Sequence, residues 1–221
     1  MADISAIKEL AAVLCLGNIA NGLVDLSDET VSNTDYLYNV LKQEIDIRAK
    51  KKIDTLRKES RMPSKVFDET RVASGLRWQL EEIKKIDFAN DIQNIVIVGD
   101  CGTGKTSLAV KIALDAIQRG ISAYYTTEED LVVSNRRQKS HWNKILKSDL
   151  IVVDDLFYLT PSEENLQLLY RTVMFLAETR SFIFVTNRAL SEWDSMCADR
   201  HTASTFRQRI MTGTQLIHLG L

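Results

Sequence analysis

The stretch IVIVGDCGTGKT, Ile95 to Thr106, decides the fold of this chain. Its first four residues, Ile95 to Val98, are all apolar and β-branched, which predicts a short strand covered on both faces. A loop with three glycines follows, and the apolar spacing from Ser107 to Arg119 predicts a helix that stops at Gly120. A buried strand, a glycine loop and a helix in this order are typical of an open α/β sheet with an anion site at the loop.

The loop, GDCGTGKT, matches the G-x-x-x-x-G-K-[ST] pattern of phosphate-binding loops. Its glycines allow successive N–H groups to face an anion, and the helix adds the positive end of its dipole. We expect Lys105 to reach the β and γ phosphates as a catalytic group and the Thr106 hydroxyl to hold Mg²⁺. Cys101 is either a small filler or a thiol made reactive by the positive field of the loop. The predicted nucleotide-binding residues are Gly99, Asp100, Cys101, Gly102, Thr103, Gly104, Lys105, Thr106 and Ser107.

Further apolar runs downstream predict the rest of a parallel sheet. Runs without polar alternation indicate strands that helices cover on both faces. Thr160, Pro161 and Glu163 fit a cap, a first-turn proline and a capping-box acid of a helix. One face of that helix holds Leu166, Leu169, Tyr170, Val173 and Ala177. The predicted strands after Ile95 to Val98 are Ile121 to Tyr125, Leu150 to Val153, Phe182 to Val185 and Gln215 to Leu219.

Two of these strands end in polar residues. LIVVDDL, Leu150 to Leu156, places Asp154 and Asp155 where ligands of open α/β sheets bind. We expect Asp154 to hold Mg²⁺, directly or through water, and Asp155 to polarise an attacking water. FIFVTN ends at Asn187, which is expected to orient that water. Taken alone, each of these strand ends is also compatible with an ordinary turn.

The region before the sheet has a different character. The spacing of apolar residues from Met1 to about Met62 predicts helices, the second of which runs into a basic arm, Arg48 to Lys65. The arm holds eight Lys or Arg residues against two acids. We therefore divide the chain into a helical amino-terminal domain, residues 1–66, for DNA or partner binding, and an α/β domain, residues 67–221.

Composition excludes several classes of protein. The chain has 221 residues, 45% of them apolar and 26% charged, without an apolar run of the length that spans a bilayer. Without a signal-peptide pattern, we expect it to stay in the cytoplasm. Cys15, Cys101 and Cys197 are far apart, which argues against a disulfide framework or a zinc site. The net charge of −2 does not by itself predict a nucleic-acid partner.

Two basic segments are candidates for DNA contact. The first is the arm, which contains no aromatic residue, so contact with phosphates is more plausible than base stacking. The second is NRRQKSHW, Asn135 to Trp142, where cations lie beside an aromatic residue. A solvated helix face and a polar surface loop are the respective alternatives. The candidate residues are Arg48, Lys50, Lys51, Lys52, Arg57, Lys58, Arg136, Arg137 and Lys139.

Three segments together resemble a known family: GDCGTGKTSLA, DLIVVDDLFYL and TNRALSEWDSM with STFRQRI. They are similar to the IstB-type transposition helper ATPases of insertion sequences, which belong with the DnaC-like helicase loaders in the AAA+ class. The resemblance covers nearly the whole chain. It implies a P-loop NTPase of AAA+ type that uses ATP and Mg²⁺, forms a homo-oligomer on duplex DNA, and recruits or activates a transposase.

The resemblance also implies an arrangement of the site. In the family, the strand ending at Asn187 lies between the P-loop strand and the strand ending at Asp155. The arginine before the last strand acts on the neighbouring subunit, and the match places it on Arg209, with Arg207 as the alternative. We expect no C-terminal lid after Leu219. The interval from Asp130 to Asp149 is compact for the family, so its extra helix, which is typical of initiators and loaders, is hard to assign from the sequence. Adenine contacts are placed by resemblance in Phe67 to Leu76.

Three other functions fit parts of the pattern. A replicative helicase loader of the DnaC type would have the same ATPase core but would prefer single-stranded DNA and bind a helicase. A small-molecule kinase would need a lid with arginines and an acceptor pocket. A nucleotide-binding switch would not depend on Asp155 for turnover.

Overall fold

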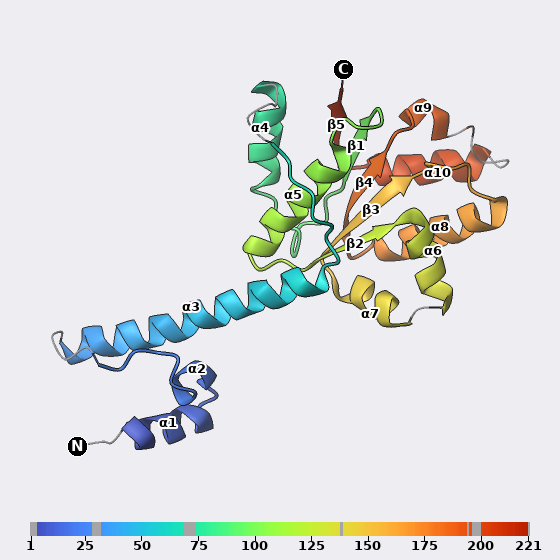
Figure 1. Ribbon diagram of the computed structural model, residues 1–221. Coiled ribbons are helices and arrows are strands. Elements are labelled where there is room, and N and C mark those ends of the chain that lie inside the picture. The colour runs from blue at the N-terminus through green and yellow to red at the C-terminus, as the bar shows by residue number, and fades with distance from the viewer. Residues whose placement is uncertain are drawn as a thin grey trace. The chain divides into compact units, whose positions relative to one another are not determined.

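The computed structural model describes residues 4–27, 32–68, 74–137, 139–193, 195 and 200–220. The chain divides into two compact units, Met1–Thr55 and Leu56–Leu221. The first unit contains helices, and the second contains a sheet with helices around it (Figure 1). The boundary between the two units falls within one long helix, α3 (Asn33–Glu59).

The first unit is held together by a small apolar core and one buried acid. Its helices are α1 (Ile4–Val13), α2 (Gly17–Ala20) and the first part of α3. Glu44 is 2% exposed, and its carboxylate accepts hydrogen bonds from the Ile19 N–H (2.9 Å), the Asn18 amide (3.2 Å) and Arg48 (2.9 Å). Because a buried carboxylate is costly unless its oxygens have partners, these bonds fix α2 against α3. The apolar core consists of Ala11, Ile19, Val24 and Val40.

The second unit is built on a five-stranded parallel sheet with the order β2-β3-β4-β1-β5. This confirms the predicted sheet and the predicted place of β4 between the other two motif strands. The nearly continuous burial of β1, β3 and β4 agrees with their unbroken apolar sequences. The strands are β1 (Ile95–Gly99), β2 (Ala123–Thr127), β3 (Leu150–Leu156), β4 (Ser181–Thr186) and β5 (Gln215–Leu219).

Helices cover both faces of this sheet (Figure 1). Residues at alternate positions of a strand point to opposite faces, so Val96 and Val98 belong to one face and Ile95 and Ile97 to the other. The first pair lies in a large apolar cluster with residues of α6, α7, α8 and α10. The helices of this unit are α4 (Ser74–Ile83), α5 (Lys105–Gln118), α6 (Glu128–Arg137), α7 (Lys139–Lys147), α8 (Glu163–Leu176), α9 (Leu190–Trp193) and α10 (Arg200–Met211).

The start of one helix, α8, differs from the sequence-based expectation, and the helices before β3 were not assigned from the sequence. The cap of α8 is Ser162, and not Thr160 with Pro161 in the first turn: the Ser162 hydroxyl accepts from the Asn165 N–H (3.3 Å) and the helix begins at Glu163. Ser162 has the extended backbone that a capping side chain needs, so the start of the helix moves past the proline. The compact interval before β3 holds both α6 and α7.

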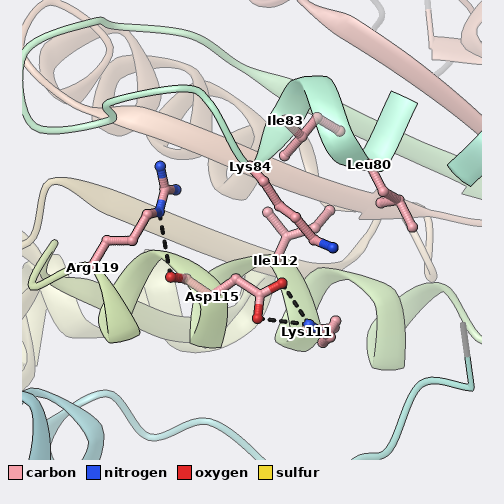
Figure 2. A pocket seen from close by; sticks show the side chains of 7 residues that line it. All are labelled: Leu80, Ile83, Lys84, Lys111, Ile112, Asp115 and Arg119. Atoms are coloured by element: carbon pink, nitrogen blue, oxygen red, sulfur yellow. Dashed lines mark hydrogen bonds and ion pairs between the residues drawn. The ribbon is translucent and has the colours of Figure 1, made fainter. Parts of the chain in front are cut away.

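A small cavity separates α4 from α5 (Figure 2). Leu80, Ile83 and Ile112 form its apolar wall, and the ion pair of Lys111 with Asp115 (2.6 Å) lies at its side. Its volume is about 10 Å³, which is at the lower limit for one water molecule. This hollow is therefore a packing contact between two helices and has no room for a nucleotide.

The carboxyl end of β5 lies unusually close to the loop after β1. Gly99 pairs with Leu219, and a Cβ atom on Gly99 would lie 2.1 Å from the Leu219 carbonyl oxygen. A Cβ atom on Gly220, which has a φ of +92°, would lie 2.6 Å from the Thr103 methyl carbon. Only residues without a side chain fit at these two positions, so β5 directly supports the glycine loop.

We predict that Gly99→Ala destabilises the sheet unit by about 1–3 kcal/mol, because the added methyl group overpacks backbone that cannot move away. Urea unfolding followed by tryptophan fluorescence measures this, since Trp78, Trp142 and Trp193 all lie in the sheet unit.

Gly75→Ala is the matched control. No atom lies within 4 Å of the Cβ position at Gly75 in α4, and alanine in a helix is favoured over glycine by about 0.5–1 kcal/mol. Equal unfolding midpoints for the two variants would contradict the close contact between β1 and β5.

Candidate nucleotide-binding site

The glycine loop has the geometry of an anion site. Gly102 and Gly104 have φ angles of +82° and +91°, which residues with side chains rarely adopt. The Thr103 hydroxyl (2.8 Å) and the Lys105 ammonium (2.6 Å) both donate to the Asp100 carbonyl oxygen. Gly104 caps α5 and offers no side chain to its first N–H groups, which leaves them for an anion.

Asp154 is a buried carboxylate with an oriented partner on each oxygen. It is 3% exposed, its Oδ2 accepts from the Tyr125 hydroxyl (2.7 Å), and its Oδ1 accepts from the Asp155 N–H (2.9 Å). Asp154 is in register with Thr127 of β2, at the carboxyl end of both strands. A carboxylate fixed in this way beside a phosphate-binding loop suits Mg²⁺, which takes one or two protein carboxylates and completes its shell with phosphates and water.

Asp155 projects from the same strand end with an unusual backbone. Its φ is +56°, a left-handed conformation that costs a residue with a side chain about 1–2 kcal/mol. Partial burial raises the pKa of its carboxyl, the charge of Asp154 raises this pKa further, and the charge of Lys105 lowers it. Lys105 is therefore close enough to Asp155 to act on its charge.

Asn187 follows β4 and lies against the glycine loop. Its side-chain nitrogen is 3.8 Å from the Cys101 sulfur. Its amide oxygen is buried and has no hydrogen-bond partner among the described residues. Because β4 lies between β3 and β1, the structure brings Asn187 between the loop and the two acids. An unpartnered amide oxygen at this place is suited to accept a hydrogen bond from a water molecule and so orient it.

Two open clefts border these residues. One, of about 460 Å³, lies beside Asp155 between the start of α6 and the loop that leads to α8. The other, of about 590 Å³, is lined by Gly99, Asp100, Asn187 and the end of β5. The candidate site is therefore accessible from solvent on both sides.

Sequence reasoning missed two polar residues at the site, Tyr125 and Glu128. The Glu128 carboxylate accepts from the Phe157 N–H (2.6 Å), in the segment that follows Asp155. Phe157 also has a positive φ of 59°, so Glu128 holds a strained turn directly after the two acids. The acidic first turn of α6 was visible in the sequence, but its contact with the turn after β3 depends on tertiary structure.

Arg209 lies on the last turn of α10, before β5. Phe206 and Ile210 anchor this helix in the apolar core, whereas Arg209 is exposed and Arg207 is partly buried. An exposed arginine on a rigid helix is accessible to a second subunit.

Phe67 approaches Gly104, with its Cε2 atom 4.0 Å from the Cβ position of that glycine. The rest of the expected adenine segment includes residues 69–73, which lie outside the described residues.

The basic candidates for DNA contact fall into three groups. Arg48 donates to Glu44 and to the Cys15 carbonyl oxygen (2.8 Å), and Lys51 donates to the Asn18 side chain (2.6 Å), so both hold the first unit together. The side chains of Arg136 and Arg137 lie outside the described part. Arg48 and Lys51 are nevertheless exposed, and the other exposed candidates are Lys50, Lys52, Arg57, Lys58 and Lys139. Cys15 and Cys101 are free thiols, and Cys197 lies outside the described residues.

Comparison with known proteins agrees with this geometry. The family model described as IstB-like ATP binding protein matches residues 10–220. The chain belongs to this family.

In the part of the chain that the structure describes, no helix has the length and apolar character needed to span a membrane.

Several relatives belong to insertion sequences. The chain is 28% identical over 237 residues to an insertion sequence IS21-like ATP-binding protein of Bacteroides fragilis, covering 100% of this chain and 90% of the relative. It is also 28% identical to the insertion sequence IS5376 ATP-binding protein of Geobacillus stearothermophilus, covering 87% and 81% of the two chains.

Solved structures share the fold. The crystal structure of the DnaC helicase loader matches with a TM-score of 0.55 at 20% identity, over 70% of this chain and 93% of that chain. The crystal structure of DnaI matches with a TM-score of 0.54 at 16% identity, over 76% and 94%. These matches show the predicted P-loop fold of AAA+ type.

We predict that Glu128→Gln changes the pH dependence of stability. Burial raises the pKa of Glu128, so the native chain holds this proton more tightly than the unfolded chain does. The resulting stabilisation is complete below the ordinary pKa of glutamate and is lost as the pH rises through the native pKa. Glutamine keeps an acceptor for the Phe157 N–H without the titration. The variant should therefore gain stability relative to wild type as the pH rises from about 5 to about 8.

Glu129→Gln is the control, because Glu129 lies in the same helical turn and is exposed. Thermal melting at several pH values measures both differences. Parallel pH profiles for wild type and Glu128→Gln would contradict the burial of this carboxyl.

Proposed function

We propose that this protein is an ATP-dependent helper of DNA transposition that binds and hydrolyses ATP, assembles on duplex DNA, and recruits or activates a transposase. The proposal rests on one observation: Asp154, Asp155 and Asn187 gather at the carboxyl edge of the sheet beside Lys105 and the glycine loop. Its relatives are named as ATP-binding proteins of insertion sequences, which supports the biological setting.

Each residue at this edge has a distinct role in the proposed reaction. The loop N–H groups and Lys105 bind the phosphates of ATP, and Thr106 and Asp154 hold Mg²⁺. The bound ion neutralises charge on the phosphate oxygens. Asp155, at the same strand end as Asp154, polarises the attacking water and accepts its proton. Asn187 orients the water through its unpartnered amide oxygen.

Arg209 completes the site of the next subunit. The transition state places charge on the γ phosphate that Lys105 and Mg²⁺ only partly neutralise, and an arginine supplied in trans stabilises it. The exposure of Arg209 on an anchored helix supports this role. Hydrolysis then depends on assembly, which links ATP turnover to the DNA-bound oligomer.

The second candidate function is a replicative helicase loader of the DnaC type, which the shared fold favours. The two functions differ in their DNA and in their partner. Preference for duplex over single-stranded DNA, together with a transposase gene beside the coding sequence, supports the transposition helper. Preference for single strands and binding to a hexameric helicase would support the loader.

We predict that two inactive variants restore activity when mixed. Asp155→Asn should lower ATP turnover by about 10²–10⁴-fold with nucleotide binding kept, because only the base is lost. Arg209→Ala should lower turnover by about 10³-fold or more with nucleotide binding kept. In a mixture, an intact Arg209 from the first variant meets an intact Asp155 of the second, so phosphate release should recover.

Arg207→Ala is the matched control for the arginine, two residues away on the same helix. Full turnover in Arg209→Ala combined with loss in Arg207→Ala would assign the role to Arg207. Unchanged turnover in Asp155→Asn would support a nucleotide-binding switch, and a mixture without recovery would contradict action in trans.

We predict that binding to duplex DNA weakens steeply with salt, because exposed cations of the arm displace counterions from phosphates. The plot of log affinity against log salt should lose about one unit of slope for each phosphate-contacting side chain removed among Lys50, Lys52, Arg57 and Lys58. Filter binding with alanine variants measures this slope. Lys85→Ala, an exposed lysine of the sheet unit outside the arm, is the control. A wild-type slope near zero would remove the arm as a DNA-binding element.

A further inference from the structure

A tyrosine of β2 reaches across the sheet to the candidate metal ligand. Tyr125 is in register with Val152, whereas Asp154 lies two residues further along β3, opposite Thr127. Residues two apart in a strand share a face, so Tyr125 and Asp154 are diagonal neighbours on one side of the sheet. The hydroxyl of Tyr125 spans this diagonal and donates to Asp154 Oδ2 at 2.7 Å.

This hydrogen bond limits how the Asp154 carboxylate can turn. Its Oδ1 already accepts from the Asp155 N–H, so the two bonds fix both oxygens. Each carboxylate oxygen has two lone pairs, and one on each remains for a metal ion or its water. A tyrosine hydroxyl ordinarily loses its proton only at about pH 10, so at physiological pH it is a donor to this carboxylate.

Tyr125 is itself held from outside the sheet. Its backbone N–H donates to the carbonyl oxygen of Ser60 (2.8 Å), a residue that is 1% exposed just after α3. The next residue, Arg61, forms an ion pair with Asp130 of α6 (3.3 Å). It also contacts a ring nitrogen of His141 of α7 (3.1 Å). Contacts on both sides of β2 thus fix the strand position from which the tyrosine reaches Asp154.

We propose that Tyr125 is a positioning residue that orients the Asp154 carboxylate for Mg²⁺ bound with nucleotide. The inference rests on the proposed Mg²⁺–ATP site and adds a residue that acts on the metal only through Asp154. Outer partners of ligating carboxylates contribute about 10–100-fold to metal affinity when they fix the ligand's orientation. The effect of Tyr125 is therefore on the metal step and not on nucleotide binding as such.

The adjacent Tyr124 provides a matched control within the same strand. Its hydroxyl is buried and has no hydrogen-bond partner among the described residues, and its ring belongs to the apolar cluster on the other face. Tyr124→Phe and Tyr125→Phe each remove one buried or half-buried hydroxyl from neighbouring positions. Only Tyr125→Phe removes a bond to Asp154.

The experiment measures binding of a fluorescent, non-hydrolysable ATP analogue to the full chain, first in EDTA and then over a Mg²⁺ titration. Tyr125→Phe should keep the wild-type affinity in EDTA within about twofold, and should raise the half-saturating Mg²⁺ concentration about tenfold. Tyr124→Phe should follow the wild-type curve in both conditions. Melting temperatures of the nucleotide-free proteins are measured in parallel.

The outcomes separate this inference from the proposed function. If the wild-type chain binds no nucleotide, the ATP site itself is wrong. If wild type binds and Tyr125→Phe has the same Mg²⁺ dependence, the positioning role alone is overturned, whatever the melting temperature. Equal losses of affinity with and without Mg²⁺ would also overturn it, because they would mean that Tyr125 shapes the nucleotide pocket and not the metal ligand.

Discussion

Parallel pairing of β4 with both β1 and β3 is the constraint on which the site depends. It aligns the carboxyl ends of three strands at one edge: Asp154 and Asp155 lie in the last residues of β3, Asn187 directly follows β4, and the glycine loop with Lys105 follows β1. The glycine loop, Asn187 and the two aspartates come from positions far apart in the chain. Helices cover both faces of these strands, and their buried residues give the polar groups a rigid base.

The sheet and the glycine loop were predictable because their signals are local. An apolar run such as Phe182 to Val185 is typical of a strand that is buried on both faces. The pattern GDCGTGKT between a strand and a helix is typical of a phosphate-binding loop. The predicted cap of α8 was wrong because Thr160 and Ser162 are both residue types that cap helices, and only the backbone conformation decides between them. Tyr125 was not predictable as a partner of Asp154, because their contact depends on the register of β2 with β3, which apolar runs do not encode.

The basic arm shows a second limit of sequence patterns. A run of cations has the same appearance whether its members only face solvent or also bind other groups of the protein. Arg48, Lys50, Lys51 and Lys52 are all exposed, but Arg48 and Lys51 also bind groups of the first unit. The difference arises from the helical rotation of 100° per residue, which turns neighbouring cations toward different surroundings.

The contact between Ser60 and Tyr125 also bears on how copies of this chain can associate. β2 is an edge strand, and an open edge is a template on which another chain can add a strand and begin to aggregate. The Ser60 carbonyl oxygen accepts a hydrogen bond from the Tyr125 N–H, which points outward from this edge. The chain then changes direction at Arg61, whose backbone is left-handed, and Pro63 follows. Continuous extension of the sheet across β2 is blocked there, so the homo-oligomer that we propose would form through other surfaces, such as the exposed end of α10.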